Sequence, residues 1–195
     1  MSFPILTVLI VLPAAGALLT ILMPNTRPEY ARTVGYAVSV ATFAIAVYLL
    51  YDFNRADADY QFVSSHAWME PLGVRWTVGV DGISLFMVAL TALLIPIGLL
   101  ASANISRAKS FIAWMLLLEA GLIGVFLALD LILFFIFFEV VLVPMYAIIA
   151  GWGGEGRRHA AVKFLLYTLF GSVLLLVGVF LVVTKAGTAD LIVLS

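Results

Sequence analysis

LILFFIFFEVVLVPMYAIIA, residues 131–150, holds a single acidic residue, Glu139, and no basic residue. A run of about 20 apolar residues is long enough to cross the hydrocarbon core of a bilayer as a helix. Lipid offers backbone amides no hydrogen-bond partner, so a run of this length must satisfy its own amides by forming a helix. The stretch therefore predicts a membrane-spanning helix with a carboxylic acid near its middle.

Five other apolar runs of similar length occupy much of the chain, at residues 3–23, 31–51, 82–101, 111–129 and 162–183. Hydrophobic residues make up 65% of the 195 residues and charged residues 11%, a balance far from that of a soluble domain. We predict an all-α membrane protein, a bundle of six transmembrane helices in one transmembrane domain that takes in residues 1–195.

Composition also excludes several kinds of site. The chain has no cysteine, so it can form neither a disulfide nor a thiolate-ligated iron–sulfur cluster. His66 and His159 fall in separate loops, which supports neither a metal cluster nor a Ser–His catalytic pair. The net charge of −1 argues against a nucleic-acid partner. We therefore expect no metal, no cofactor and no catalytic centre in this chain.

Basic residues between the runs predict the orientation, because Lys and Arg are retained on the cytoplasmic side. One set of alternate loops carries seven of them and the other set carries three. The larger set is Arg27, Arg32, Arg107, Lys109, Arg157, Arg158 and Lys163, and the smaller set is Arg55, Arg75 and Lys185. The N-terminus of this multi-pass protein is therefore predicted to lie outside.

The only long connection, residues 52–81, falls on the outer side and has more acidic than basic residues. Its fragments 60–63 and 74–78 have the alternating pattern of short strands, so the loop can hold a β-hairpin. The favoured interpretation is nevertheless a solvent-facing loop, with Trp68 and Trp76 as anchors at the membrane interface.

Glu139 is the first candidate functional residue. A carboxylate at bilayer depth costs roughly 2.5 to 3.5 kcal/mol on insertion scales, so an acid at this depth favours a role in handling protons or ions. The alternative is a protonated side chain that forms a structural hydrogen bond between helices. We favour the functional role for Glu139.

Glu119 is the second candidate, because only Asp130 separates the fourth and fifth runs. Those helices must be antiparallel neighbours joined by a tight turn. At 1.5 Å per residue, Glu119 would lie about 16 Å and Glu139 about 13 Å from that turn, both near the middle of the bilayer. Two facing carboxyl groups in a low dielectric cannot both be ionised cheaply, so such a pair would act as a proton switch. For Glu119 itself, functional and structural roles both remain open.

Two further residues complete the candidate proton pathway. Pro144 cannot donate a hydrogen bond to the carbonyl of Val140, so it predicts a helix kink that could hold water beside Glu139. A purely structural kink is equally consistent with the sequence. Lys163, at the start of the sixth run, is best interpreted as an interfacial lysine whose stem snorkels, with a pathway role as the alternative.

Several strings in the chain resemble a known family. Residues 121–130 read GLIGVFLALD, residues 134–146 read FFIFFEVVLVPMY, and Trp152 and Gly153 follow. Residues 80–85, VDGISL, and 163–168, KFLLYT, extend the similarity over essentially the whole chain. These strings are similar to the antiporter-like membrane subunits, called subunit M, of respiratory NADH-quinone oxidoreductase (complex I).

The resemblance implies a function and a set of partners. It implies a subunit of NADH:quinone oxidoreductase that couples quinone reduction elsewhere in the complex to proton pumping, and that binds no NADH, flavin or cluster itself. Its partners would be other membrane-arm subunits and the lipid bilayer, with quinone involved only indirectly. The membrane would be a bacterial inner membrane. The family's glutamate on the fifth span, part of its proton path, corresponds to Glu139.

The chain departs from the family in length. Family members carry many more spans than the six that 195 residues can supply, and their lysine partner lies on the next, broken span. We expect the N-terminal portion of such a subunit, either truncated or completed by a partner chain. A subunit of a multisubunit cation/proton antiporter is the alternative, and a scaffold of six helices without transport is a third possibility.

Overall fold

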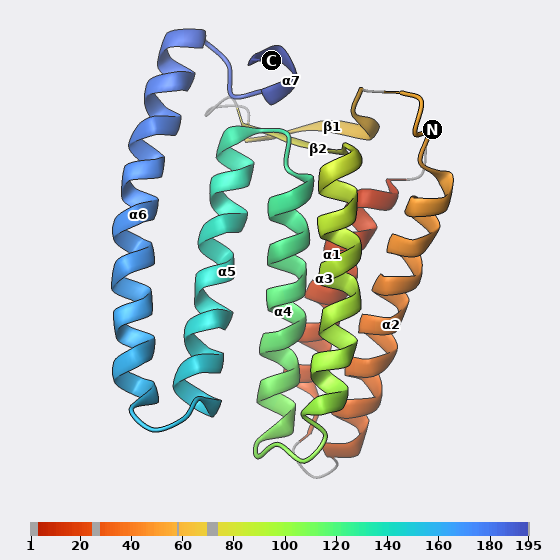
Figure 1. Ribbon diagram of the computed structural model, residues 1–195, viewed down its shortest axis with the longest axis vertical. Coiled ribbons are helices and arrows are strands. Elements are labelled where there is room, and N and C mark those ends of the chain that lie inside the picture. Colours follow the sequence, from red (N-terminus) through yellow and green to blue (C-terminus); the bar gives the residue numbers. More distant parts are fainter. Residues whose placement is uncertain (1–3, 25–27, 58, 70–73, 195) are drawn as a thin grey trace.

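The computed structural model describes residues 4–24, 28–57, 59–69 and 74–194. Within these residues six long helices stand side by side and alternate in direction (Figure 1). They are α1 (Ile5–Leu22), α2 (Pro28–Asp52), α3 (Gly82–Ala101), α4 (Ala108–Leu127), α5 (Leu131–Trp152) and α6 (Arg157–Ala186), and a short helix, α7 (Leu191–Leu194), follows them. All six are long and apolar enough to cross a membrane, which confirms the predicted helical bundle.

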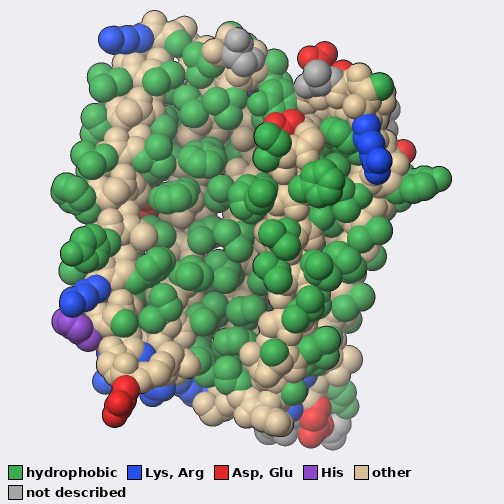
Figure 2. Space-filling model, in the orientation of Figure 1, with side chains coloured by type: hydrophobic (Ala, Val, Ile, Leu, Met, Phe, Trp, Pro, Cys, Tyr) green, Lys and Arg blue, Asp and Glu red, His purple; other side chains and the backbone are tan. Residues whose placement is uncertain are grey.

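The surface of the bundle fits a lipid environment. Figure 2 shows hydrophobic side chains over the middle of one face, with charged side chains gathered towards its two ends. Large apolar side chains on the outside are open to the surroundings, among them Ile83 at 73% exposure and Phe170 at 71%. Exposed apolar patches of this extent are rare on soluble monomers, so the surface matches the predicted membrane-spanning helices.

Helix α4 lies at the centre of the bundle and packs against α1, α2, α3 and α5. Its side chains Leu116, Ile123 and Leu127 are completely buried. Helix α6 packs against α5 at one side of the bundle, where it forms the left edge in Figure 1. Most of its side chains are consequently exposed.

Two glycines bring α4 and α5 close together. A β-carbon at Gly121 would come within 2.8 Å of Val141 Cγ2, and a β-carbon at Gly124 would overlap the ring of Phe137. Small residues allow this approach between membrane helices, whose association depends on close packing. They also define the antiparallel register, with Gly121 opposite Val141 and Gly124 opposite Phe137.

The long connection forms a β-hairpin across one end of the bundle (Figure 1). Strands β1 (Gln61–Met69) and β2 (Val74–Val80) pair antiparallel, with Ser65 opposite Thr77 and His66 opposite Trp76. In β2, the side chains of Val74, Thr77, Val78 and Val80 are buried. The prediction that this loop can hold a β-hairpin is confirmed. The favoured interpretation as a solvent-facing loop is wrong for β2, because its apolar residues pack against the ends of the helices.

Trp76 packs this hairpin against the helices of the bundle. Its ring nitrogen donates a hydrogen bond to Thr7 Oγ1 at 3.1 Å, and its ring packs edge-on against Phe137 at 5.7 Å between centroids. Trp68 packs edge-on against Trp76 at 5.9 Å and remains 49% exposed. Trp76 thus contacts α1 and α5, whereas Trp68 keeps the exposure expected of an interfacial anchor.

The short connection between α4 and α5 joins the hairpin to the end of the chain. Leu129 donates its amide to the carbonyl of Thr77 at 2.9 Å, and Leu131 donates to the carbonyl of Ala189 at 2.9 Å. Leu191 in turn donates to the carbonyl of Leu129 at 2.9 Å. The connection therefore lies as an extended segment between β2 and residues 189–191, and the predicted tight antiparallel junction of the two helices is confirmed.

Asp130 caps α5, and its loss should destabilise the protein. Its carboxylate is 1% exposed and accepts the amides of Ile132 at 2.9 Å and Leu133 at 3.0 Å. We expect Asp130→Ala to lower the free energy of unfolding by about 1 to 2 kcal/mol, because two amides of the first turn lose their acceptor. Unfolding of the detergent-solubilised protein measures this.

Asp130→Asn is the matched control for that change. Asparagine caps helices about as well as aspartate, so this variant should unfold close to the wild type. Equal stability of the alanine variant and the wild type would contradict the capping role.

Candidate functional site

Glu119 lies in the apolar centre of the bundle. Its side chain is 0% exposed, and neither carboxyl oxygen has a hydrogen-bond partner among the described residues. One turn away on either side, Leu116 and Ile123 belong to two separate buried apolar clusters, each built from residues of α1, α3 and α4 among others. An ionised carboxylate in these surroundings would need a cation, which no described neighbour supplies through an ion pair.

Glu139 occupies a different environment on α5. Its side chain is partly buried, and its Oε1 atom is buried without a hydrogen-bond partner within the described part of the chain. One turn further along α5, Leu142 is buried whereas Val143 is 54% exposed. Glu139 therefore lies near the border between the core of the bundle and its surface. Its Oε1 atom faces protein there but has no hydrogen-bond partner among the described residues.

The register of α4 and α5 sets the relative depth of the two acids. With Gly121 opposite Val141 and Gly124 opposite Phe137, residues 122 and 123 lie opposite Glu139. Glu119 is three to four residues away from that level, or about 5 Å along the helix axis. The structure thus brings both acids to similar depth on neighbouring helices, as predicted. It records no hydrogen bond between them, since the buried oxygens of both lack a partner.

Lys163 does not lie at the depth of Glu119 and Glu139. It is exposed and lies six residues into α6, about 9 Å from the start of that helix. Glu139 lies thirteen residues from the end of α5 at Trp152, or about 20 Å from the same end of the bundle. The position fits the interfacial interpretation of Lys163, and its pathway role stays a prediction.

Pro144 is buried within α5, and the helix continues through it from Leu131 to Trp152. Two prolines that the sequence interpretation overlooked, Pro13 and Pro96, lie buried inside α1 and α3. The predicted kink at Pro144 stays a prediction.

Comparison with known proteins covers nearly the whole chain. The family described as "NADH:quinone oxidoreductase/Mrp antiporter, TM" matches residues 128–195, which include Glu139. NADH-quinone oxidoreductase subunit M of Rickettsia bellii is 38% identical over 198 residues, covering 98% of this chain and 40% of the relative. Subunit M of Rhodobacter capsulatus is 41% identical over 195 residues, covering 97% of this chain and 38% of the relative. The chain is a homologue of NADH-quinone oxidoreductase subunit M.

This subunit M homologue spans about 40% of the length of those curated relatives. Among solved structures, respiratory complex I from Thermus thermophilus with bound NADH contains a chain that matches with a TM-score of 0.82 and 29% identity, over 97% of this chain and 38% of that one. The Mrp complex from Dietzia sp. DQ12-45-1b matches with a TM-score of 0.78 at 21% identity, covering 95% of this chain and 20% of that one, and this likeness shows the fold alone. The resemblance to the subunit M family is thereby confirmed.

The structure of the homologue buries one polar residue, at about the depth of Glu139, that sequence reasoning missed. Ser172 is 2% exposed, although most of α6 is exposed, and its hydroxyl donates to the carbonyl of Leu169 at 3.0 Å. Counted from the same end of the bundle, Ser172 lies fifteen residues into α6 and Glu139 thirteen residues along α5, so the two are about 3 Å apart in depth. The sequence shows a serine within an apolar run, which could have marked Ser172 as a candidate. It does not show that this side chain is buried, because burial depends on the packing of α6 against another helix.

Proposed function

We propose that the chain forms the N-terminal part of a proton-translocating membrane-arm subunit of NADH-quinone oxidoreductase, in which Glu139 takes up and releases a proton. The observation that carries this proposal is the carboxyl group at mid-membrane depth with a buried oxygen that has no hydrogen-bond partner in the described chain. A structural acid would be expected to bond across helices. Its position within the region that matches the oxidoreductase family supports the same role.

The two acids have separate parts in the proposed path. Glu139, at the border of the bundle, exchanges its proton with groups outside α1 to α5. Glu119, about one turn away in depth on the neighbouring helix, is the candidate second proton holder in the apolar core. Protonation of one acid lowers the electrostatic cost of ionising the other, so the pair would hold one shared proton.

The path needs further groups from the rest of the assembly. A vectorial path requires proton carriers that reach both faces of the membrane, and Glu119 and Glu139 lie within about 5 Å of each other in depth. We propose that other membrane-arm subunits, or a further part of the same subunit, supply these carriers, including the basic partner of Glu139. Quinone reduction would take place elsewhere in the complex, with no NADH, flavin or cluster bound by this chain. The assembly would lie in a bacterial inner membrane with the hairpin end of the bundle outside.

The competing function is that of a subunit of a multisubunit cation/proton antiporter, whose family description and fold this chain shares. Relatives at 38% to 41% identity that carry the oxidoreductase name favour the first function. Purification of the tagged chain from its own membranes in mild detergent separates the two functions. We expect it to copurify with NADH:quinone reductase activity, and sodium-dependent proton exchange without redox activity would overturn the proposal in favour of the antiporter.

A further inference from the structure

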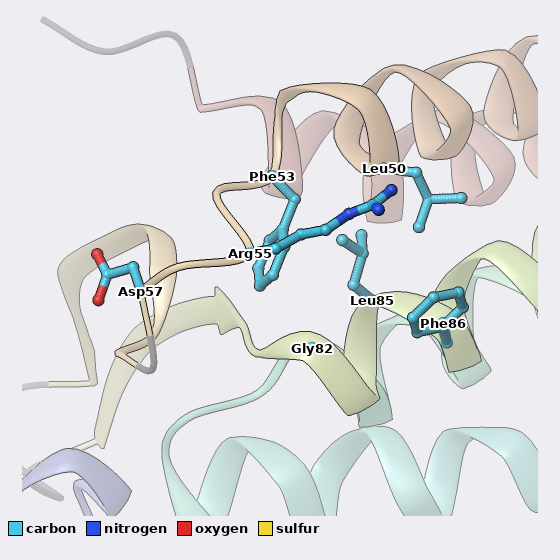
Figure 3. A pocket seen from close by; sticks show the side chains of 7 residues that line it. All are labelled: Leu50, Phe53, Arg55, Asp57, Gly82, Leu85 and Phe86. Carbon is cyan, nitrogen blue, oxygen red and sulfur yellow. The ribbon is translucent and has the colours of Figure 1, made fainter.

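A cavity of about 500 Å³ opens where α2 ends and α3 begins, at the hairpin end of the bundle (Figure 3). Its walls are largely apolar and come from both helices and from the residue that follows α2. They are formed by Leu50, Phe53, Leu85 and Phe86, and Gly82 completes the wall at the first residue of α3. Because α2 and α3 are both long enough to span the membrane, this cavity lies at the boundary between hydrocarbon and headgroups.

Two opposite charges line the same cavity without pairing. Figure 3 shows the Arg55 side chain passing Phe53, with its guanidinium directed towards Leu50 and Leu85. The Asp57 carboxylate lies at the left of the view and points away from that guanidinium. Arg55 makes no hydrogen bond or ion pair with any described residue, and one oxygen of Asp57 accepts the amide of Asp59 at 3.1 Å. An arginine beside apolar walls and an acid held apart from it would suit a ligand with two charges and an apolar part.

The apolar surface continues from the cavity into the membrane-spanning part of the bundle. One turn further along each helix, Val47 on α2 is 45% exposed and Leu90 on α3 is 48% exposed. Phe86, which lines the cavity, is itself 67% exposed. A hydrocarbon chain that leaves the cavity would therefore lie on apolar side chains of α2 and α3.

We propose that this cavity binds a phosphatidylethanolamine molecule from the leaflet at the hairpin end of the bundle. Arg55 donates hydrogen bonds to the phosphate, as guanidinium groups do with high geometric fit. Asp57 is exposed, so its carboxylate can turn towards the headgroup, where it accepts a hydrogen bond from the ethanolamine ammonium. An acyl chain lies over Phe86 and Leu90. This binding mode gives each of the two exposed charges an oppositely charged partner and covers the apolar walls at once.

The two charges distinguish this lipid from others of the same shape. Phosphatidylglycerol brings a net negative charge that Asp57 repels, and it has no ammonium group. Phosphatidylcholine keeps the phosphate and the positive charge, but its quaternary nitrogen has no N–H to donate to Asp57. A soluble phosphate ester has the headgroup alone and leaves the apolar walls uncovered.

Native mass spectrometry of the full chain, released from detergent with one lipid at a time, tests the proposal. The three lipids should carry identical acyl chains, so that only the headgroup differs. We expect phosphatidylethanolamine to bind about tenfold more tightly than phosphatidylcholine or phosphatidylglycerol, as one additional charge-assisted hydrogen bond would give. Arg55→Gln should lower phosphatidylethanolamine binding about tenfold, and Arg55→Lys should lower it less.

Two variants show which charge recognises which part of the headgroup. Asp57→Asn should remove the preference for phosphatidylethanolamine over phosphatidylcholine while it relieves the repulsion of phosphatidylglycerol. Arg75→Gln is the matched control, because Arg75 is an exposed arginine of β2 at the same end of the bundle and contacts Ser65 at 3.1 Å, away from the cavity. It should bind all three lipids as the wild type does.

Other outcomes would overturn the proposal. Equal binding of the three lipids would contradict the proposed site. So would an Arg55→Gln variant that folds and binds phosphatidylethanolamine like the wild type. Strongest binding of phosphatidylglycerol, unchanged in Asp57→Asn, would indicate a site for anionic lipids in its place. Glycerophosphoethanolamine without acyl chains should compete poorly, and competition equal to that of the lipid would indicate a soluble ligand.

Discussion

Exchange of Glu139 for glutamine should lower proton translocation by the assembled oxidoreductase at least about tenfold, since positioned proton-transfer groups contribute factors of this size or more. Glutamine has nearly the same volume as glutamate, so the packing of α5 against α4 should persist. It can still place a polar amide where the buried Oε1 atom now lies. It cannot take up and release a proton, so the change removes the proposed chemistry and little else.

Proton uptake into vesicles that contain the purified assembly, driven by NADH and quinone, measures this effect. Glu139→Asp retains a carboxyl group on a shorter side chain and should have a milder defect. Glu155→Gln is the matched control, because Glu155 is exposed in the turn between α5 and α6. Native gel electrophoresis shows whether each variant assembles. An assembled Glu139→Gln variant with the normal ratio of protons to electrons would refute the proposed role.

Exchange of Gly124 for alanine should destabilise the bundle by about 1 to 3 kcal/mol, the usual cost of overpacking a close contact. The new β-carbon would overlap the ring of Phe137, and Trp76 packs against that ring at 5.7 Å. The ring therefore cannot move aside without disturbing the contact between the hairpin and α5. The alternative is a separation of α4 from α5, which would also move Glu139.

Unfolding of the purified chain in detergent, by heat or by denaturant, measures the loss. Gly171→Ala is the matched control, because a β-carbon at this position in α6 meets no atom within 4 Å. It should be neutral or stabilising by up to about 1 kcal/mol, as alanine favours a helix over glycine. Adding Phe137→Leu to Gly124→Ala should recover part of the lost stability, because it removes ring atoms from the overlap. A Gly124→Ala variant as stable as Gly171→Ala would contradict the close contact.

Part of the candidate site was predictable from the sequence. Glu139 was identifiable because an acid within an apolar run is unusual whatever surrounds the helix. Glu119 was placed at nearly the correct relative depth because a short connection makes α4 and α5 antiparallel neighbours. Ser172 and the cavity around Arg55 were not predictable, since both depend on which side chains of separate helices face one another.

The sequence by itself determined the six membrane-spanning helices, their alternating direction and the presence of an acid at mid-depth. Each of these features follows from the free energy of placing one segment in lipid. That free energy depends on the segment's own backbone hydrogen bonds and on the cost of burying its own side chains in hydrocarbon. Only the tertiary structure decided the register that Gly121 and Gly124 give to α4 and α5, the burial of β2 and the separation of Lys163 from Glu139. Apolar side chains gain little by leaving lipid for one another, so helices associate through the fit of their surfaces, and that fit depends on shapes that residues far apart in the sequence create together.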